Sequence, residues 1–171
     1  MARTSYANIL ALPDAALAHN FDLFFPTIPG GGSAAGITYK CKTTAMPSSS
    51  LETVKIELHG TSKVEAGRAT YTHTFNATFL ETVDYATISA FRAWRNYMRS
   101  WKSNTGTDSS AYKVNLELDL YDNAGKTVRT VILAGAFITE IAEVTYSGAE
   151  SAAVELTLSF SFDYINDGAS Y

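Results

Sequence analysis

Hydrophobic and polar residues alternate along most of this chain, which is typical of β-strands that bury one face. The alternation is most regular over Thr53–His59, Tyr71–Leu80, Tyr112–Tyr121 and Ala153–Ile165. We expect these strands to turn their apolar side toward a core. In the first strand the inward residues would be Val54, Ile56 and Leu58, and in the last strand Val154, Leu156, Leu158, Phe160, Phe162 and Tyr164.

Shorter apolar runs and turn residues complete the strand pattern. Further strands are expected at His19–Phe25, Tyr39–Ala45, Thr127–Leu133 and Phe137–Tyr146. Glycine, proline, asparagine and serine mark the turns between strands, since these residues favour turn backbones. The turns expected from this composition are Met46–Glu52, Gly60–Gly67, Asp122–Gly125 and Ser147–Glu150.

One stretch, Asp84–Lys102, has helical spacing in place of alternation. We expect Asp84 to cap its first turn and Ser103–Gly106 to end it. The apolar stripe of this helix consists of Ile88, Phe91, Trp94, Met98 and Trp101. A basic stripe, rotated by about 100°, consists of Arg92, Arg95, Arg99 and Lys102. One face should therefore be buried, while the basic face meets water or an acidic partner.

These elements predict a mainly β fold, with about eight antiparallel strands in a sandwich or barrel and one inserted helix. Residues 1–17 lack a clear period and are expected to form an N-terminal arm. The polar side of strands 71–80 and 154–164 holds threonine, serine and asparagine with little charge. Solvated sheets carry more lysine and glutamate, especially at their edges. The hydroxyl-rich side therefore favours sheets that continue into a neighbouring subunit.

Composition limits the class of protein. The 171 residues, 46% of them apolar and 18% charged, are enough for a single domain, expected to span residues 1–171, with a substantial core. No apolar run reaches the roughly 18 residues that a membrane helix needs, and no secretory signal is expected. The net charge of −4 argues against a protein that grips nucleic acid. The single cysteine, Cys41, favours synthesis in a reducing compartment.

Residues with reactive side chains form no catalytic or metal-binding motif. We expect His73, on the apolar side of its strand, to be a hydrogen-bonded core residue, and His59 to face solvent; His19 is far from both in sequence. Cys41 lies between two lysines but has no base nearby, so we expect a packed thiol. The acidic residues resemble solvated strand faces rather than a catalytic pair: Glu117, Asp119, Glu140 and Glu143.

The glycine-rich stretch Pro29–Gly36 is expected to be a flexible loop. A phosphate-binding loop would be followed by Lys-Ser/Thr and would open a helix, and neither feature is present. The sequence leaves the role of residues Gly30–Gly36 open. We therefore expect no enzyme activity, no cofactor and no metal.

Several stretches carry a further signal through their order along the chain. They are FDLFF with the loop after it, CKTTAMPSSSLETVKIELHG, GRATYTHTFNATFLETVDY leading into FRAW, and the end of the chain from LDLYDNAGKTVRTVIL to SFSFDY. Each consists of packing and turn residues and is not diagnostic alone. Together they cover nearly the whole chain and resemble the inner tail tube proteins of contractile bacteriophages, which are related to R-type pyocin tubes and to the type VI secretion ring protein.

The resemblance implies a structural protein with a tail-tube-like fold. Copies would close into a six-membered ring, and rings would stack into a hollow tube inside a contractile sheath. Strands would join across subunits into one β-barrel around the channel. This agrees with the hydroxyl-rich strands, because a head-to-tail contact can close a ring, and closure removes exposed sheet edges.

The channel would let DNA slide through without holding it. Cations on its wall would bind phosphates through counterion release, whereas a hydroxyl-rich, neutral to acidic wall would not. We therefore predict that the hydroxyl-rich strand faces, with two charged residues nearby, line the lumen. These lumen-lining residues are Lys55, Glu57, Thr72, Thr74, Asn76, Thr78, Glu155, Thr157, Ser159, Ser161 and Asp163.

Two further surfaces are predicted from the same resemblance. The helix would lie outside the tube, with its basic stripe facing the sheath: Arg92, Arg95, Arg99 and Lys102. The turns Met46–Glu52 and Gly60–Gly67 would contact the next ring. The residues expected in that contact are Met46, Pro47, Ser48, Leu51, Glu52, Lys63, Glu65 and Arg68.

The expected partners are further copies of the chain, a tail sheath protein, and baseplate and tail-terminator proteins. DNA would be passing cargo only, and the chain itself would not insert into membranes. The expected location is the phage tail of a virion, assembled in the host bacterial cytoplasm. Two alternatives stay open: the tube of a headless contractile injection device of the pyocin or type VI kind, and a monomeric ligand-binding β-barrel.

Overall fold

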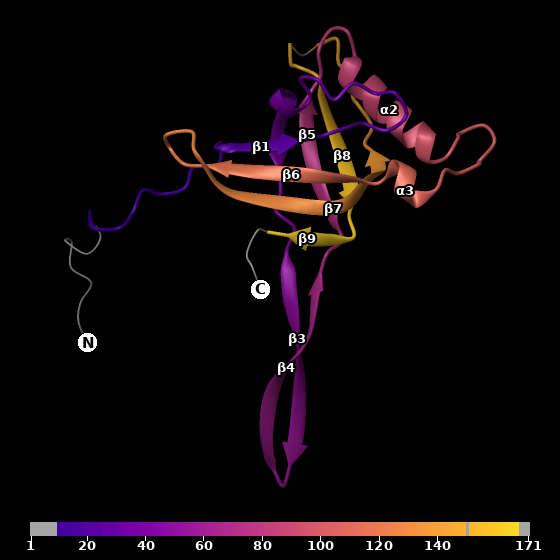
Figure 1. Ribbon diagram of the computed structural model, residues 1–171. Coiled ribbons are helices and arrows are strands. Elements are labelled where there is room, and N and C mark those ends of the chain that lie inside the picture. The colour runs from indigo at the N-terminus through magenta and orange to yellow at the C-terminus, as the bar shows by residue number, and fades with distance from the viewer. Residues whose placement is uncertain (1–9, 150, 168–171) are drawn as a thin grey trace.

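The structure, a computed structural model, describes residues 10–149 and 151–167 (Figure 1). The described residues contain nine strands and one helix longer than a single turn. The prediction of a mainly β, antiparallel protein with one inserted helix is confirmed. The strands are β1 Phe21–Phe24, β2 Cys41–Thr44, β3 Ser49–Leu58, β4 Thr61–Tyr71, β5 Thr74–Leu80, β6 Val114–Tyr121, β7 Thr127–Ile141, β8 Glu155–Ser161 and β9 Tyr164–Asn166; the helices are α2 Ala86–Met98, α3 Ser109–Tyr112 and the 3-10 turn η1 Thr38–Lys40.

One bent sheet runs through the body in the order β1-β6-β7-β8-β5-β2, with β9 also beside β7. Figure 1 shows β6 and β7 crossing the direction of β5 and β8, so the two halves of the sheet enclose the core between them. Strand β7 belongs to both halves. Its first part pairs with β6 and β9, and its last part, from Phe137, pairs with β8.

The prediction of separate strands at Thr127–Leu133 and Phe137–Tyr146 is wrong, because β7 is one strand that ends at Ile141. Its bend lies at Gly135, whose φ of +67° is one that residues with a side chain rarely adopt. A Cβ at this position would lie 2.2 Å from Asp163 Oδ2. Because the backbone changes direction at Gly135, the alternation of apolar and polar residues starts again after it. The sequence pattern therefore resembles two separate strands.

The predicted strand Ala153–Ile165 is also wrong in its extent, because the chain divides into β8 and β9. Between them it passes from one half of the sheet to the other, and the Asp163 amide donates to the Ala134 carbonyl at 2.9 Å. Tyr164, expected to face the core, is therefore exposed. The inward residues of β8, by contrast, are buried as predicted: Leu156, Leu158 and Phe160.

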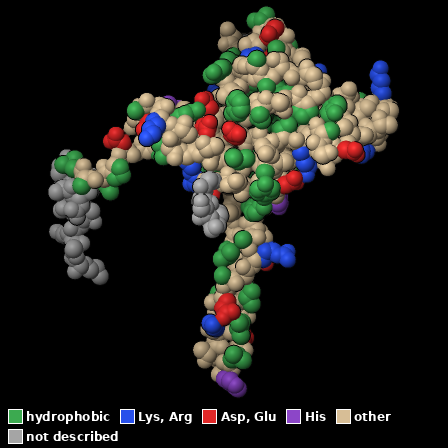
Figure 2. Space-filling view, viewed as in Figure 1, with side chains coloured by type: hydrophobic (Ala, Val, Ile, Leu, Met, Phe, Trp, Pro, Cys, Tyr) green, Lys and Arg blue, Asp and Glu red, His purple; other side chains and the backbone are tan. Residues whose placement is uncertain are grey.

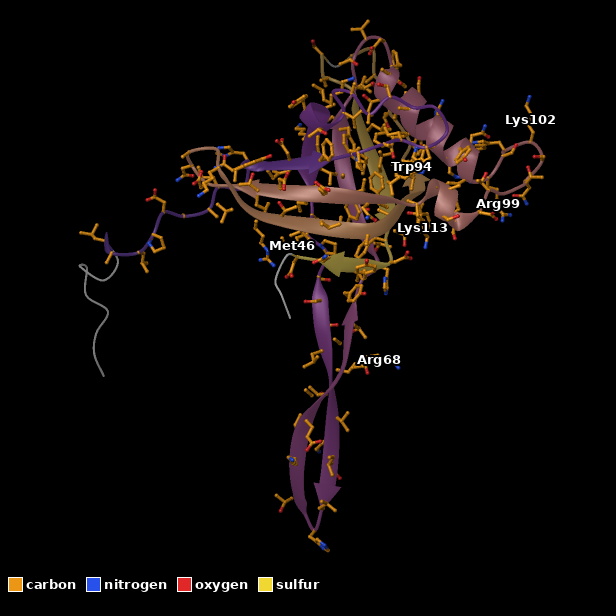
Figure 3. The ribbon with its side chains drawn as sticks, viewed as in Figure 1. Met46, Arg68, Trp94, Arg99, Lys102 and Lys113 are labelled. Carbon is orange, nitrogen blue, oxygen red and sulfur yellow. The ribbon has the colours of Figure 1, made fainter. Side chains whose placement is uncertain are left out.

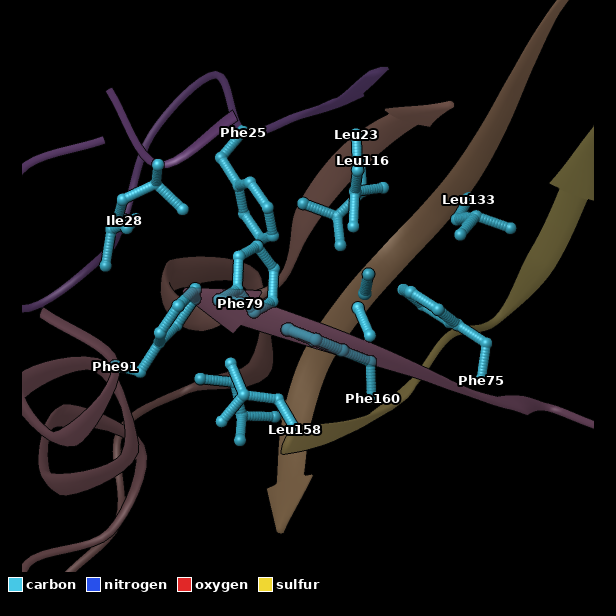
Figure 4. Packing of buried hydrophobic residues seen from close by; sticks show 14 of the residues in the cluster. Leu23, Phe25, Ile28, Phe75, Phe79, Phe91, Leu116, Leu133, Leu158 and Phe160 are labelled. Carbon is cyan, nitrogen blue, oxygen red and sulfur yellow. The ribbon is translucent and has the colours of Figure 1, made fainter. Parts of the chain in front are cut away.

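Aromatic rings fill the centre of the body (Figure 4). Phe91 of α2 lies 5.6 Å from Phe25 and 5.3 Å from Phe79, measured between ring centroids. The rings of Phe75 and Phe160, from neighbouring strands, stack at 5.0 Å. All five of these phenylalanine side chains are buried. The alternation in β5 and β8 predicts this burial for Phe75, Phe79 and Phe160.

The helix is shorter than Asp84–Lys102 at both ends. Tyr85, with a φ of +51°, is the N-cap in place of Asp84. In the first turn, Asp84 Oδ1 still accepts from Ala86 N at 3.4 Å, as predicted, while the Glu81 carboxylate accepts from Thr87 N at 3.2 Å and from Ile88 N at 2.7 Å. A carboxylate at this end also favours the helix dipole.

The chain leaves the helix at Arg99, whose backbone is extended, and folds back so that the Thr107 amide donates to the Met98 carbonyl at 3.0 Å. Trp101, predicted on the buried stripe, is consequently 72% exposed. The helix is anchored instead by Trp94, whose indole N–H donates to the Tyr112 carbonyl at 2.9 Å. Tyr112 ends α3, so the strand predicted at Tyr112–Tyr121 begins two residues later.

Strands β3 and β4 pair only with each other among the described strands, and they form a long hairpin that projects from the body (Figures 1 and 2). The predicted turns are wrong here, because Ser49–Glu52 and Thr61–Gly67 lie in strands and the turn is only His59–Gly60. Both turn residues have positive φ, +48° and +79°, as a two-residue type I′ hairpin requires.

The predicted burial of this hairpin is wrong as well. Val54 and Leu58 are 49% and 65% exposed, and Ile56 is half-buried. These residues alternate as predicted, but no part of the body covers them.

Another prediction that fails is the core position of His73, which is exposed; its Nδ1 lies 3.0 Å from the Phe162 carbonyl oxygen. His59, at the hairpin turn, is exposed as predicted.

Candidate assembly surfaces

The predicted hydroxyl-rich residues of β5 and β8 do lie on one outer face. The register places Thr74 opposite Ser161, Asn76 opposite Ser159 and Thr78 opposite Thr157. The hydroxyl oxygens of Thr78 and Thr157 are 3.2 Å apart. Neighbouring strands extend this face, because β2 and β7 add one threonine each. We call it the hydroxyl face: Thr43, Thr74, Asn76, Thr78, Thr139, Thr157, Ser159 and Ser161.

The charges around the hydroxyl face are few and leave it neutral to acidic. Lys42 of β2 reaches across to form an ion pair with Glu155 of β8. Glu140 is exposed and lies opposite Ser159 in the register. Thr139 donates its hydroxyl to the Ser159 carbonyl at 3.0 Å. Among the residues named on this face, the one cation is thus already neutralised by a carboxylate.

The structure does not bring four of the predicted lumen residues to the hydroxyl face. Lys55 and Glu57 lie on the projecting hairpin, where they form an ion pair with each other. Thr72 lies in the connection between β4 and β5, with its hydroxyl 3.5 Å from that of Ser48. Asp163 lies at the bend of the sheet, where Lys113 Nζ contacts its carboxylate at 2.7 and 2.8 Å.

Sequence reasoning missed Thr43, Thr139, Lys42 and Glu140 at this face. The runs that hold Lys42 and Thr43 are short, and a β-bulge between Cys41 and Thr43 disturbs their alternation. Thr139 lies within a second irregularity, between Ile138 and Glu140, and Glu140 directly follows it. Bulges shift side chains from one face to the other, so only the register places these residues.

The half-sheet with the hydroxyl face has two open edges among the described residues. Strand β2 pairs with β5 on one side only, and the end of β7, Thr139–Ile141, pairs with β8 only. The hydroxyl oxygen of Thr44, on β2, is buried and has no hydrogen-bond partner in the described structure. Open edges expose backbone donors and acceptors that another strand can use.

The predicted sheath-facing residues extend from the middle of α2 to the loop after it, and only two of them belong to the helix. Arg92 is exposed, and the guanidinium of Arg95 lies 5.3 Å from the centroid of the exposed Trp101 ring. Arg99 caps the helix and donates to Asn104 Oδ1 at 3.3 Å. Lys102 projects from the loop that follows (Figure 3).

The residues predicted to contact the next ring are divided between the root of the hairpin and its strands. Met46, at the root, is 47% exposed, and Arg68 lies further along β4 (Figure 3). Lys63 and Glu65 form an ion pair on β4. The others also lie at the root or on β3: Pro47, Ser48, Leu51 and Glu52.

Two of the side chains considered for chemistry, Cys41 and Asp119, have structural roles. Burial raises the pKa of the Cys41 thiol to about 12, and the negative charge of Asp22 adds to this, so the thiol stays protonated at neutral pH. Asp119 accepts a hydrogen bond from the Thr130 hydroxyl on the neighbouring strand. No group of three or more metal-ligating side chains occurs among the described residues. The same residues include no helix long and apolar enough to cross a membrane.

The glycine-rich loop packs against the helix. A Cβ at Gly30 would lie 2.7 Å from the Cβ of Tyr97 and 2.8 Å from the carbonyl oxygen of Ala93. At Gly32 it would lie 3.0 Å from the carbonyl oxygen of Ala90. The glycines thus allow the loop to approach α2 closely, which is a packing role that the composition did not reveal.

Comparison with known proteins identifies the family. A family model described as phage tail tube protein matches residues 9–166, which is nearly the whole chain. The chain belongs to the phage tail tube protein family. The resemblance inferred from the sequence is therefore confirmed, and this tail tube protein is a structural component of a tail rather than an enzyme.

Solved structures share the fold of this tail tube protein at low sequence identity. The sheath/tube terminator of an extracellular contractile injection system, PVC, matches with a TM-score of 0.67 and 14% identity over 93% of this chain and 100% of the other. A chain of the PVC sheath–tube complex matches with 0.63 and 16%, over 98% and 100%. A chain from the tail of an empty gene transfer agent particle matches with 0.54 and 14%, over 91% and 100%. No curated protein sequence matches significantly.

Proposed function

We propose that this tail tube protein closes into six-membered rings that stack into a hollow tube, with the hydroxyl face turned toward the bore. The observation that carries the proposal is the pair of open edges on one half-sheet. Strand β2 of one copy would add to the end of β7 in the next copy. This contact is head-to-tail, so it closes into a ring when the rotation between copies allows it.

The hydroxyl face suits the wall of a channel for DNA. Threonine, serine and asparagine side chains offer hydrogen bonds but no fixed positive charge, and the Lys42 ammonium is paired with Glu155. Binding to DNA through phosphates grows with the number of contacting cations. A wall without free cations therefore lets the duplex slide during genome ejection.

The partners of this protein follow from the position of a tube inside a tail. The basic residues near the end of α2 would lie on the outside, facing a sheath protein, and the β3–β4 hairpin would contact the next ring. Baseplate and terminator proteins would bind the two ends of the tube. The structural neighbours include a sheath/tube terminator and a sheath–tube complex, which supports these assignments. Assembly would take place in the host bacterial cytoplasm, and the finished tube would form part of the virion tail.

Electron microscopy of the purified protein tests ring formation directly. We expect rings or tubes with a central channel in negative stain. A protein that stays monomeric at high concentration, with normal secondary structure, would overturn the proposal.

The lining of the bore is tested by adding cations. The double substitution Asn76→Lys and Thr157→Lys on the hydroxyl face should leave tubes intact but make them retain short DNA duplexes in a salt-dependent way. The matched control places two lysines on the hairpin formed by β6 and β7, away from the hydroxyl face: Asn123→Lys and Val128→Lys. If the control retains DNA equally well, the hydroxyl face does not line the bore.

A further inference from the structure

The two open edges of the half-sheet with the hydroxyl face each hold one exposed charged residue. Strand β2 contributes Lys42, and the free end of β7 contributes Glu140. The register places Glu140 opposite Ser159, on the outer side of the sheet. Lys42 lies in the β-bulge beside Thr43, whose side chain is on the same outer side. The two opposite charges therefore share one face and stand at its two opposite edges.

Neither charge is fully satisfied within its own copy. The Lys42 ammonium has three N–H donors, and its one ion-pair partner among the described residues is Glu155 of β8. The side chains of this pair remain 56% and 42% exposed. Glu140 forms no ion pair within the part of the chain that the structure describes. A lysine with spare donors and a carboxylate without a cation thus lie at edges that another copy can reach.

The shortness of both edges limits how they can pair between copies. Strands β7, β8, β5 and β2 alternate in direction, so β2 of one copy would continue the alternation beside β7 of the next. The available segments are Cys41–Thr44 and Thr139–Ile141. An antiparallel pairing that uses both segments sets Lys42 opposite Glu140 or one residue away. Long side chains reach such neighbours, which lie up to about 7–8 Å apart.

We propose that Glu140 of one copy forms an ion pair with Lys42 of the next copy, so that Lys42 lies between two carboxylates, its own Glu155 and the neighbour's Glu140. This inference rests on the proposed ring and names the side chains that select the contact. Opposite charges across two strands stabilise their pairing, whereas like charges destabilise it. The seam between copies then holds one cation and two anions, an excess of negative charge that gives phosphates no cation to bind.

Charge inversion separates the contact within a copy from the contact between copies. The double variant Lys42→Glu, Glu155→Lys keeps an ion pair within each copy, at exposed sites, so the monomer should fold normally. Its carboxylate at position 42 then opposes Glu140 of the next copy. Because this repulsion recurs at every seam of a ring, the protein concentration needed for ring formation should rise by about tenfold or more. Adding Glu140→Lys should restore ring formation. Sedimentation velocity over a concentration series measures it.

The matched control adds Glu143→Lys to the double variant in place of Glu140→Lys. Glu143 is also exposed but lies beyond the end of β7, so it should give no rescue. Glu140→Lys alone, which leaves the pair within each copy untouched, should weaken ring formation as the double variant does. Normal ring formation by either of these variants, failure of Glu140→Lys to rescue the double variant, or equal rescue by Glu143→Lys would overturn the inference. Absence of rings from the unsubstituted protein would instead contradict the proposed function.

Discussion

The body and the projecting hairpin have the same sequence pattern and opposite surroundings. Leu158 of β8 and Leu58 of β3 both stand in strands of alternating apolar and polar residues, yet Leu158 is fully buried and Leu58 is 65% exposed. In the body, the second half of the sheet and α2 cover the apolar side. In the hairpin, nothing in the same chain does so. Alternation thus predicts that one side of a strand avoids water, but not which molecule covers it.

A matched pair of truncations gives the largest contrast between the two regions. Leu158→Ala should lower the free energy of unfolding by about 2–5 kcal/mol, because it leaves a cavity in the core. Leu58→Ala should change it by about 0.5 kcal/mol or less. Urea unfolding of dilute, unassembled protein measures both values, since assembly would add its own stability. Equal losses for the two variants would contradict the distinction.

The bend in β7 gives the next effect. Gly135→Ala would place a methyl group against Asp163 at a φ of +67° and should destabilise the monomer by about 1–3 kcal/mol. Gly60 has a similar φ of +79° at the hairpin turn, with open space around it. Gly60→Ala is therefore the control for backbone strain alone, and it should cost less than Gly135→Ala. Thermal unfolding followed by circular dichroism ranks the two, and the reverse order would show that the contact with Asp163 is unimportant.

Shortening the hairpin should separate folding from assembly. Removing residues 54–65 and joining Thr53 to Ala66, which are cross-strand partners, through an Asn-Gly turn should change monomer stability by about 1 kcal/mol or less. Size-exclusion chromatography should show a folded protein, and micrographs should show rings without long tubes. Unfolding of the shortened protein would mean that the hairpin supports the body.

A single side chain, Cys41, on the edge of the body, provides the most local test. Because its pKa is raised to about 12, its thiolate is scarce in the folded protein, and alkylation at pH 8 should be about 100-fold slower, or more, than in urea. As pH rises past about 8.5, the unfolded thiol ionises while the folded thiol does not, so this group lowers stability at high pH. Mass spectrometry after iodoacetamide treatment measures the rates. Fast labelling of folded protein would contradict the burial of this thiol.

The fold class was predictable because the body strands are long and regular. Phe75, Ala77 and Phe79 alternate without interruption, and their burial follows from that pattern. The errors lie where a single residue changes the backbone. Gly135 bends β7, Arg99 ends the helix before Trp101, and a two-residue turn at His59–Gly60 replaces a longer one. Local spacing does not reveal these changes of direction.

The assembly surfaces were predictable in part. The hydroxyl residues of β5 and β8 lie together because both strands are regular and adjacent, whereas Lys55 and Glu57 fell on the hairpin. The pairing of β7 with β8 was predictable as a hairpin, because the two strands are consecutive, but the sequence held no signal for the adjacency of β5 with β2 and with β8, which are far from it along the chain. The open edges exist only after folding, and the sequence pattern could not show them.

The most direct test of the whole account is a cryo-electron microscopy reconstruction of the assembled tube. The account predicts that Thr78 and Thr157 face the bore, and that β2 of each copy pairs with the end of β7 in the next. A tube whose hydroxyl faces point outward, or whose half-sheets remain unpaired between copies, would contradict it.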